Sequence, residues 1–220
     1  SQYDFSKAFN PPFLSKNVQE NTNAKNCQLP MGLTSENVAE RYKVTREMQD
    51  AFAAESQRKA AEAQENGSLN QEITPMETVV HYSDGNEKKF VADKDEGVRK
   101  QTTLESLTKL KPVFKKDGTT TAGNSSQLTD GAAAVLLARR STAERLGLPI
   151  KGRVLGYAVV GVNPEIMGVG PAVAIPKALA KSGLKVEDID IYEINEAFAS
   201  QALYCVKELN IPEEKVNPRG

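Results

Sequence analysis

The sequence is poor in the residue types that build metal and disulfide sites. Its 220 residues include one histidine, two cysteines and no tryptophan. Cys27 and Cys205 are far apart and lie in unlike contexts, which favours two reduced thiols in an intracellular compartment over a disulfide. With one histidine and no cysteine cluster, the sequence predicts no zinc site, either structural or catalytic.

Strong charge and long apolar runs are also missing. The formal net charge is −1, whereas nucleic-acid-binding domains usually carry a clear basic excess. No apolar run reaches membrane-spanning length, and the first residues do not show a basic-then-apolar signal pattern. With 39% hydrophobic and 26% charged residues, we expect a folded protein of one or two domains that binds neither nucleic acid nor membrane.

The first third of the chain predicts helices after an irregular start. Residues 1–26 are polar and rich in asparagine, and we expect them to form a loop. A short helix is expected next, capped by Thr34 or Ser35. A long helix follows, with Thr45 as its cap and Gly67 as its left-handed stop. The residues that share one stripe of this long helix are Met48, Phe52, Ser56, Ala60 and Ala63. We interpret this helix as scaffold rather than site.

Residues 73–92 predict a β-hairpin. Two runs rich in β-branched residues flank the turn sequence Ser-Asp-Gly-Asn at 83–86. His81 lies in the first arm, close to the turn, where a solvated histidine is more common than a catalytic one.

Two consecutive polar segments could together serve a phosphorylated ligand. Residues 93–116 are rich in lysine and arginine, which bind phosphate oxygens by charge-assisted hydrogen bonds. Residues 117–131 are rich in glycine, serine and threonine, and their backbone N–H groups could let a ligand lie close. The alternatives are a solvated short helix for the first segment and a flexible linker for the second.

The second half predicts an α/β architecture. Strands are expected at 132–138, 153–162 and 189–194. Helices are expected after the capping box Ser141–Glu144 and from Pro171 to Gly183. Alternating strands and helices favour a parallel sheet with right-handed crossovers.

The junction after the last expected strand is the most informative position. Apolar spacing changes from alternating to helical at Asn195-Glu196. In open parallel sheets, ligand crevices form at the carboxyl ends of strands. We expect Asn195 to cap the following helix, on whose buried face Cys205 packs. The simpler alternative is a capped helix without any site.

Several stretches in one order resemble the thiolase family, and in particular its degradative 3-ketoacyl-CoA thiolases of the peroxisomal type. The stretches are Pro30-Met-Gly-Leu-Thr-Ser-Glu-Asn-Val-Ala39, Lys109-Leu-Lys-Pro-Val-Phe114, Asp117 to Gly131, Val160-Gly-Val, Ile166-Met-Gly-Val-Gly-Pro171 and Asn195-Glu-Ala-Phe198. The resemblance implies a thiolase-like α/β fold with an inserted loop domain. It places the loop domain and its flanking segment at 1–120, the last strand and helix of the N-terminal domain at 121–146, and the first half of the C-terminal domain at 147–220.

The resemblance also implies a chemistry and a set of site residues. Thiolases cleave 3-ketoacyl-CoA with a cysteine thiolate and oriented donors for the developing oxyanion. Asn195 matches the asparagine that holds an oxyanion-donating water and is the expected catalytic residue. The positions that match CoA- and substrate-binding residues are Met31, Arg99, Ser106, Phe114, Ala122, Ser126, Leu128, Met167 and Phe198. No cofactor is implied, since coenzyme A is a substrate. The implied partners are CoA, 3-ketoacyl-CoA and, for a full-length protein, a second copy in a homodimer.

The chain departs from the family pattern at the reacting groups. The family's nucleophilic cysteine motif and its Gly-His-Pro motif do not occur here, and Cys27, His81 and Cys205 do not match them. We therefore expect the middle part of a thiolase, inactive by itself and peroxisomal by resemblance. The alternatives are a non-catalytic CoA-binding or dimer-partner fragment, a biosynthetic acetoacetyl-CoA thiolase, and a mitochondrial or cytoplasmic location.

Overall fold

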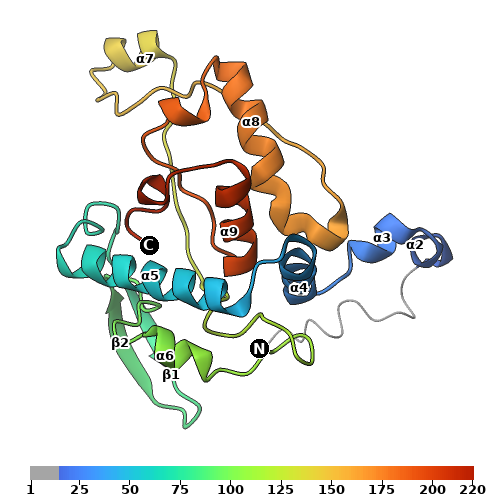
Figure 1. Cartoon of the computed structure of the whole chain (residues 1–220). Helices are drawn as coiled ribbons and strands as arrows, with labels where there is room; N and C mark the ends of the chain where they lie inside the picture. The colour runs from blue at the N-terminus through green and yellow to red at the C-terminus, as the bar shows by residue number, and fades with distance from the viewer. Residues whose placement is uncertain (1–14) are drawn as a thin grey trace.

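The computed structural model describes residues 15–220, and its helices surround a central C-terminal helix, α9 (Figure 1). The expected loop at residues 1–14 lies outside the described residues. The α-helices are α2 (Lys16–Glu20), α3 (Thr22–Asn26), α4 (Met31–Tyr42), α5 (Arg46–Glu65), α6 (Leu104–Thr108), α7 (Arg140–Arg145), α8 (Gly170–Ser182) and α9 (Ala199–Glu208). Short 3-10 helices are η2 (Pro164–Val169), η3 (Val186–Asp188) and η4 (Glu213–Lys215), and the strands are β1 (Met76–His81) and β2 (Glu87–Ala92).

Helix α9 is central because most of its faces are covered. It contacts α4, α5, α8 and η2, and its Ala202 and Cys205 are fully buried. One apolar cluster lies between α9 and the segments before and after it, and consists of Tyr192, Ile194, Val206, Ile211 and Val216. A second cluster joins α4 to η2 and consists of Val38, Ile166 and Val169.

The long helix forms as its cap signals predict. The Thr45 hydroxyl accepts a hydrogen bond from the Met48 backbone N–H at 3.3 Å, which fixes the start of α5. Gly67, two residues beyond the last helical residue, has φ +73°, as the stop signal requires. Of the predicted stripe, Met48 is exposed, the residues Phe52, Ser56 and Ala60 are half-buried, and Ala63 alone is buried.

Two expectations near the N-terminus are wrong. Residues 15–26 form α2 and α3 rather than a loop, because the side chains of Ser15 and Asn21 each accept a backbone N–H and so start a helix. Helix α4 begins at Met31, so Thr34 and Ser35 lie inside it instead of capping it.

The hairpin prediction is confirmed. Strand β1 pairs antiparallel with β2 in a register that runs from Met76↔Ala92 to His81↔Glu87. The turn places Gly85 at φ +84°. The His81 side chain is 70% exposed and lies 3.0 Å from Glu87, which agrees with a solvated histidine.

The parallel sheet predicted for the second half is wrong for the described chain. Residues 132–138 and 153–162 are assigned no strand, and Val135 is 82% exposed. Between the segments that the structure describes, the single parallel pairing is the bridge Tyr192↔Val216. A strand needs a neighbour to satisfy its backbone groups, and within residues 15–220 these two apolar runs have none.

The helices of the second half are confirmed with shifted starts. Helix α8 has Pro171 in its first turn and ends at Gly183 with φ +69°. Helix α7 begins at Arg140 without a side-chain cap, so the predicted capping box at Ser141 is wrong. The residues just before α8 form the 3-10 helix η2.

Asn195 does not cap α9, contrary to the prediction. The helix starts at Ala199, and its N-cap residue is Phe198 in an extended conformation. Phe198 forms an antiparallel bridge with Ser125, and the Ala199 N–H donates to the Asn124 carbonyl at 3.0 Å. This pairing keeps the segment around Asn195 out of the helix.

No helix among the described residues is both long enough and apolar enough to cross a membrane.

Candidate functional site

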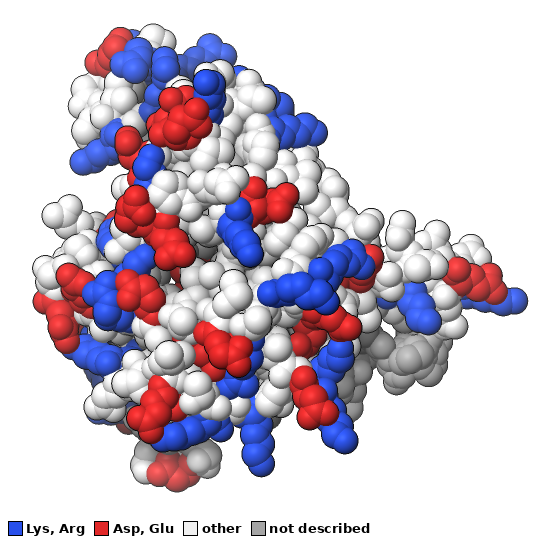
Figure 2. Space-filling view, in the orientation of Figure 1, with Lys and Arg blue, Asp and Glu red and all other residues white. Residues whose placement is uncertain are grey.

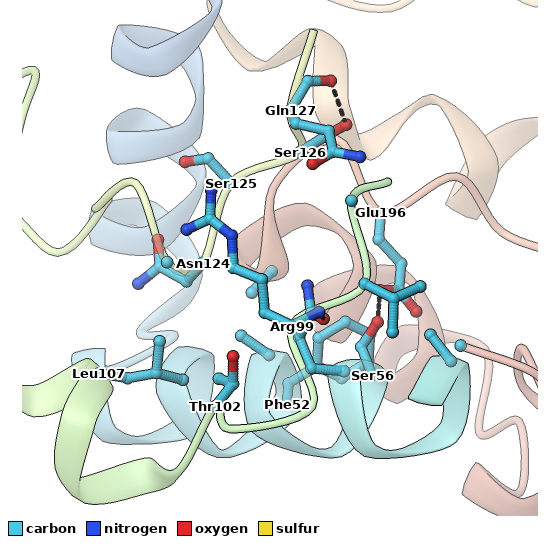
Figure 3. Close-up of a pocket in the computed structure, with 18 of the residues that line it drawn as sticks. Phe52, Ser56, Arg99, Thr102, Leu107, Asn124, Ser125, Ser126, Gln127 and Glu196 are labelled. Atoms are coloured by element: carbon cyan, nitrogen blue, oxygen red, sulfur yellow. Dashed lines mark hydrogen bonds between the residues drawn. The ribbon is translucent and has the colours of Figure 1, made fainter. Parts of the chain in front are cut away.

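A cleft of about 800 Å³ opens between α5 and the extended segment that carries Asn195 (Figure 3). The cleft has five walls. They are one face of α5, the loop at 95–102, α6 with Leu110, the serine segment 122–127, and the C-terminal region, which contributes residues from 193–199 and 217–220. The long helix is therefore part of the site, and its interpretation as scaffold alone is wrong.

The cleft brings together half of the residues that the resemblance singled out. Those lining it are Arg99, Ser106, Ala122, Ser126 and Asn195. Asn195 and Ser126 thus face one common space although 69 positions separate them (195 − 126). Figure 3 shows Arg99 extending across the opening between α5 and the serine segment.

The other residues that the resemblance singled out do not line the cleft. Met31, Met167 and Leu128 are 57%, 49% and 95% exposed and do not line the cleft. Phe114 and Phe198 pack edge to face, with ring centroids 6.3 Å apart. The Phe114 ring also lies so close to Gly32 that a Cβ there would be 2.3 Å from it.

The backbone pairs the two walls that carry the key side chains. The Ser126 N–H donates to the Ala197 carbonyl at 2.9 Å. Together with the Ser125↔Phe198 bridge, this bond fixes the spacing between the serine segment and the Asn195 segment. The relative position of Ser126 and Asn195 is therefore set by main-chain hydrogen bonds rather than by side-chain packing.

A buried carboxylate on α4 holds the start of the serine-containing loop. Glu36 is 4% exposed. Its carboxylate accepts the backbone N–H groups of Thr119 and Thr120 at 2.8–3.0 Å and the Thr119 hydroxyl at 3.2 Å. Burying a carboxylate is costly unless several donors meet it, and here the donors come from the loop.

A second buried carboxylate, on α5, holds the same loop further along. Asp50 is fully buried and accepts from Arg46 at 2.7 Å and from the Asn124 amide at 3.0 Å. Arg46 also donates to the carbonyls of Leu107 and Leu110. This network joins α5, α6 and the serine segment, which are three of the five walls.

The lysines and arginines of residues 93–116, which the sequence suggested for phosphate binding, do not form one cationic surface. Among them, Arg99 is the one that lines the cleft in the described structure. Lys100, Lys109 and Lys115 instead pair with Glu65, Glu105 and Glu40. Figure 2 shows basic and acidic side chains interspersed over this face.

Neither cysteine lines the cleft. Cys205 is 0% exposed, and burial raises the pKa of its thiol to about 11. It is therefore protonated at neutral pH and packs in the core, as predicted. Cys27 is exposed. In residues 15–220, no cluster of histidine, cysteine or acidic side chains is arranged to hold a metal ion.

Sequence reasoning missed several polar residues of the cleft. These are Ser56, Asn124, Glu196 and Asn217. A signal existed for Ser56, because it is the single hydroxyl in an otherwise apolar stripe of α5. For Asn217 the sequence gives no such signal, since the partners of its side chain lie more than 20 positions away.

Comparisons with known proteins define the class of this fold and site. The chain matches the family model of the thiolase N-terminal domain at residues 13–141 and that of the thiolase C-terminal domain at residues 148–220. It superposes on the dimeric peroxisomal thiolase of Saccharomyces cerevisiae with a TM-score of 0.87 and 52% identity, covering 99% of this chain and 54% of that one. The chain belongs to the thiolase family.

Within the thiolase family, the chain is similar to several 3-ketoacyl-CoA thiolases. The chain is 60% identical over 211 residues to the human peroxisomal 3-ketoacyl-CoA thiolase, which covers 96% of this chain and 50% of the relative. It is 63% identical to peroxisomal 3-ketoacyl-CoA thiolase B of Rattus norvegicus, again over 96% of this chain and 50% of the relative. Human mitochondrial 3-ketoacyl-CoA thiolase in complex with CoA superposes with a TM-score of 0.82 and 43% identity, covering 89% of this chain and 47% of that one. The chain spans about half the length of the relatives it matches, and its thiolase-like α/β fold is confirmed by these superpositions.

Proposed function

We propose that this chain forms the CoA-binding middle part of a peroxisomal 3-ketoacyl-CoA thiolase, which cleaves 3-ketoacyl-CoA with a second CoA to give acyl-CoA and acetyl-CoA in fatty-acid β-oxidation. The observation that carries the proposal is that Asn195 and Ser126 line one cleft together with Arg99, in a chain that belongs to this family. Coenzyme A is the substrate, with no further cofactor, and the full-length protein acts as a homodimer.

The cleft offers each part of a CoA thioester a suitable partner. Arg99 is a fixed cation that suits the phosphates of the CoA nucleotide. Ser106, Ala122 and Ser126 provide a small, partly polar wall for the narrow pantetheine arm. The Asn195 amide makes no hydrogen bond with any described residue, so it is free to hold a water that donates to the oxyanion. Met31, Phe114, Leu128, Met167 and Phe198 are proposed to complete the substrate path.

The domain assignment follows from the same proposal. Residues 1–120 correspond to the loop domain with its flanking segment, residues 121–146 to the end of the N-terminal domain, and residues 147–220 to the first half of the C-terminal domain. Neither cysteine lines the cleft, so we expect the 220-residue chain by itself to show no turnover of acetoacetyl-CoA and CoA above a blank. Measurable turnover would contradict this expectation.

Calorimetric titration of the chain with CoA tests the proposal. Arg99→Glu places a negative charge in the cleft and should weaken CoA binding at least tenfold, since a charge-assisted hydrogen bond contributes about 1.5–3 kcal/mol. Lys111→Glu is the matched control: it makes the same charge change outside the cleft and should alter the Kd less than twofold. Absence of CoA binding by the unaltered chain, or equal effects of the two variants, would refute the proposal.

A further inference from the structure

The peptide segment on both sides of Asn195 is held by one buried side chain. Asn217 is 4% exposed. Its amide oxygen accepts the Ile194 N–H at 2.7 Å, and its amide nitrogen donates to the Ile194 carbonyl at 2.8 Å. Both main-chain polar groups of the residue before Asn195 are therefore fixed by Asn217.

The residue after Asn195 is held by the same side chain and by α5. The Asn217 amide nitrogen also donates to Oε1 of Glu196 at 2.6 Å, and the Ser56 hydroxyl donates to Oε2 at 2.5 Å. Figure 3 shows the bond between Ser56 and Glu196 joining α5 to the extended segment across the floor of the cleft. Both oxygens of this carboxylate thus have short hydrogen bonds, and neither is paired with a cation of residues 15–220.

One further hydrogen bond holds the main chain of Asn195, whereas its side chain is not held. The Gln201 side chain donates to the Asn195 carbonyl at 3.0 Å, whereas the Asn195 side chain makes no hydrogen bond within residues 15–220. A free amide on a firmly held main chain is the arrangement expected of a preorganised donor, whose orientation must not depend on the ligand.

Asn217 has an unfavourable backbone conformation that its hydrogen bonds must hold in place. Its φ is +41°, in the left-handed region that asparagine tolerates better than other non-glycine residues. Its N–H also donates to the Tyr192 carbonyl at 2.8 Å. The strain is thus offset by four hydrogen bonds, three from the side chain and one from the backbone N–H, that all reach the segment from Tyr192 to Glu196.

We propose that Asn217, Glu196 and Ser56 form a positioning network that sets where the Asn195 amide lies in the cleft and couples that position to α5. The three residues act through Asn195 rather than on the ligand. The catalytic significance of the network rests on the proposed function, whereas its mechanical effect on Asn195 does not.

Side-chain NMR relaxation of the Asn195 amide in the ligand-free 220-residue chain tests the network directly. Asn217→Gly keeps the left-handed backbone but removes the three side-chain bonds, so the Asn195 amide should become at least twofold more mobile on the ps–ns timescale. Asn210→Gly is the matched control, because Asn210 also has a positive φ, of +51°, but its side chain makes no hydrogen bond to a described residue. It should leave the Asn195 signal unchanged.

Ser56 provides a test that is remote in sequence. Ser56→Ala should mobilise Asn195 across 139 positions (195 − 56), and Ser56→Thr, which retains the hydroxyl, should restore the wild-type signal. A general loss of structure would not be rescued in this way. Unchanged Asn195 relaxation in both Ser56→Ala and Asn217→Gly would overturn the network.

CoA binding by the same samples separates this inference from the proposed function. If the unaltered chain fails to bind CoA while Asn195 is mobilised as predicted, the proposed function fails and the network stands. If CoA binds and Asn195 stays equally ordered in every variant, the network fails and the proposed function stands.

Discussion

The two cysteines differ in burial: Cys27 is exposed, and Cys205 is buried in the core. Cys205 has no exposed surface, and its Sγ lies 3.6 Å from the Gly168 carbonyl. Desolvation disfavours the thiolate and therefore raises the pKa of the thiol to about 11, from an ordinary value of 9.0. Because the neutral form is favoured on folding, the folded chain retains a proton that the unfolded chain loses above pH 9.

This difference predicts a pH-dependent loss of stability. Up to about pH 9 both states keep the thiol protonated, and the free energy of unfolding is unaffected by it. Between about pH 9 and 11 the unfolded state ionises first, so stability should fall by on the order of 2 kcal/mol more than in Cys205→Ala. Urea unfolding across this range measures the difference. Cys27→Ala, at the exposed cysteine, should follow the wild-type curve, and parallel curves for all three proteins would contradict the prediction.

Single residues also show how far the sequence could predict the site. The resemblance to thiolases singled out Asn195, Ser126 and Arg99, and the structure shows that these three residues line one cleft, while their roles stay predictions. They did not reveal Asn217 or Glu196, since a buried hydrogen-bond partner is recognisable only when the distant backbone that it contacts is known. Leu128 lies within the resembling stretch from Asp117 to Gly131, yet it is 95% exposed in the described structure.

The serine-containing loop is shaped by the helices against which it packs. Helix α4 contributes Glu36 and α5 contributes Asp50, and each carboxylate accepts hydrogen bonds from the loop. A buried hydroxyl cluster adds a third link, because Ser35 on α4 lies 2.8 Å from the hydroxyl of Thr120 and 2.8 Å from that of Ser200 on α9. The loop therefore acts as a rigid wall although it has no regular secondary structure.

Replacing one of these carboxylates should loosen that wall. Glu36→Gln turns one of the two acceptor oxygens into a donor facing backbone N–H groups, and should lower the free energy of unfolding by about 1–3 kcal/mol. Hydrogen exchange at Thr119 and Thr120 should rise in parallel. Glu40→Gln is the control, one turn further along α4 at a side chain that is 67% exposed and pairs with Lys115 on the surface. Since an exposed ion pair contributes little, this variant should leave both quantities nearly unchanged. Equal effects of the two variants would show that Glu36 does not hold the loop.

Elements with local signals were predicted well, and those that depend on distant pairing were not. Helix α5 has its cap and stop within its own sequence, and the hairpin has its turn. The start of α9 was placed too early because residues 124–126 pair with residues 197–199 and keep them extended. The predicted strands at 132–138 and 153–162 are apolar enough for a sheet, but no described segment pairs with them as a strand.

At the scale of the whole molecule, the unpaired apolar segments at 132–138 and 153–162 are expected to make the chain self-associate. Among the described residues, the most exposed large side chains of the two runs are Val135, Leu136, Leu137, Val154, Tyr157 and Val159, each at least 70% exposed. Exposed apolar patches of this kind favour association, and unpaired extended segments offer their backbone groups to other chains.

The 220-residue chain should therefore self-associate and bind the dye ANS. Leu136→Lys introduces a charge into the first run and should reduce both the associated fraction and the dye fluorescence. Leu104→Lys, at an exposed site on α6 that is 47% accessible, is the control and should have a smaller effect. Light scattering coupled to size-exclusion chromatography gives the masses. A monodisperse monomer with no dye response would contradict the expectation.

The last residues of the described chain complete the cleft against α5. Lys59 donates to the Val216 carbonyl at 3.0 Å, and Gly220 lies so close to α5 that a Cβ there would come within 2.4 Å of the Ser56 carbonyl. The three side-chain hydrogen bonds of Asn217 all reach residues that come earlier in the chain, namely Ile194 and Glu196. A chain shortened to end before Asn217 would therefore keep the α5, α6 and serine-segment walls of the cleft but lose the side chain that fixes the backbone on both sides of Asn195.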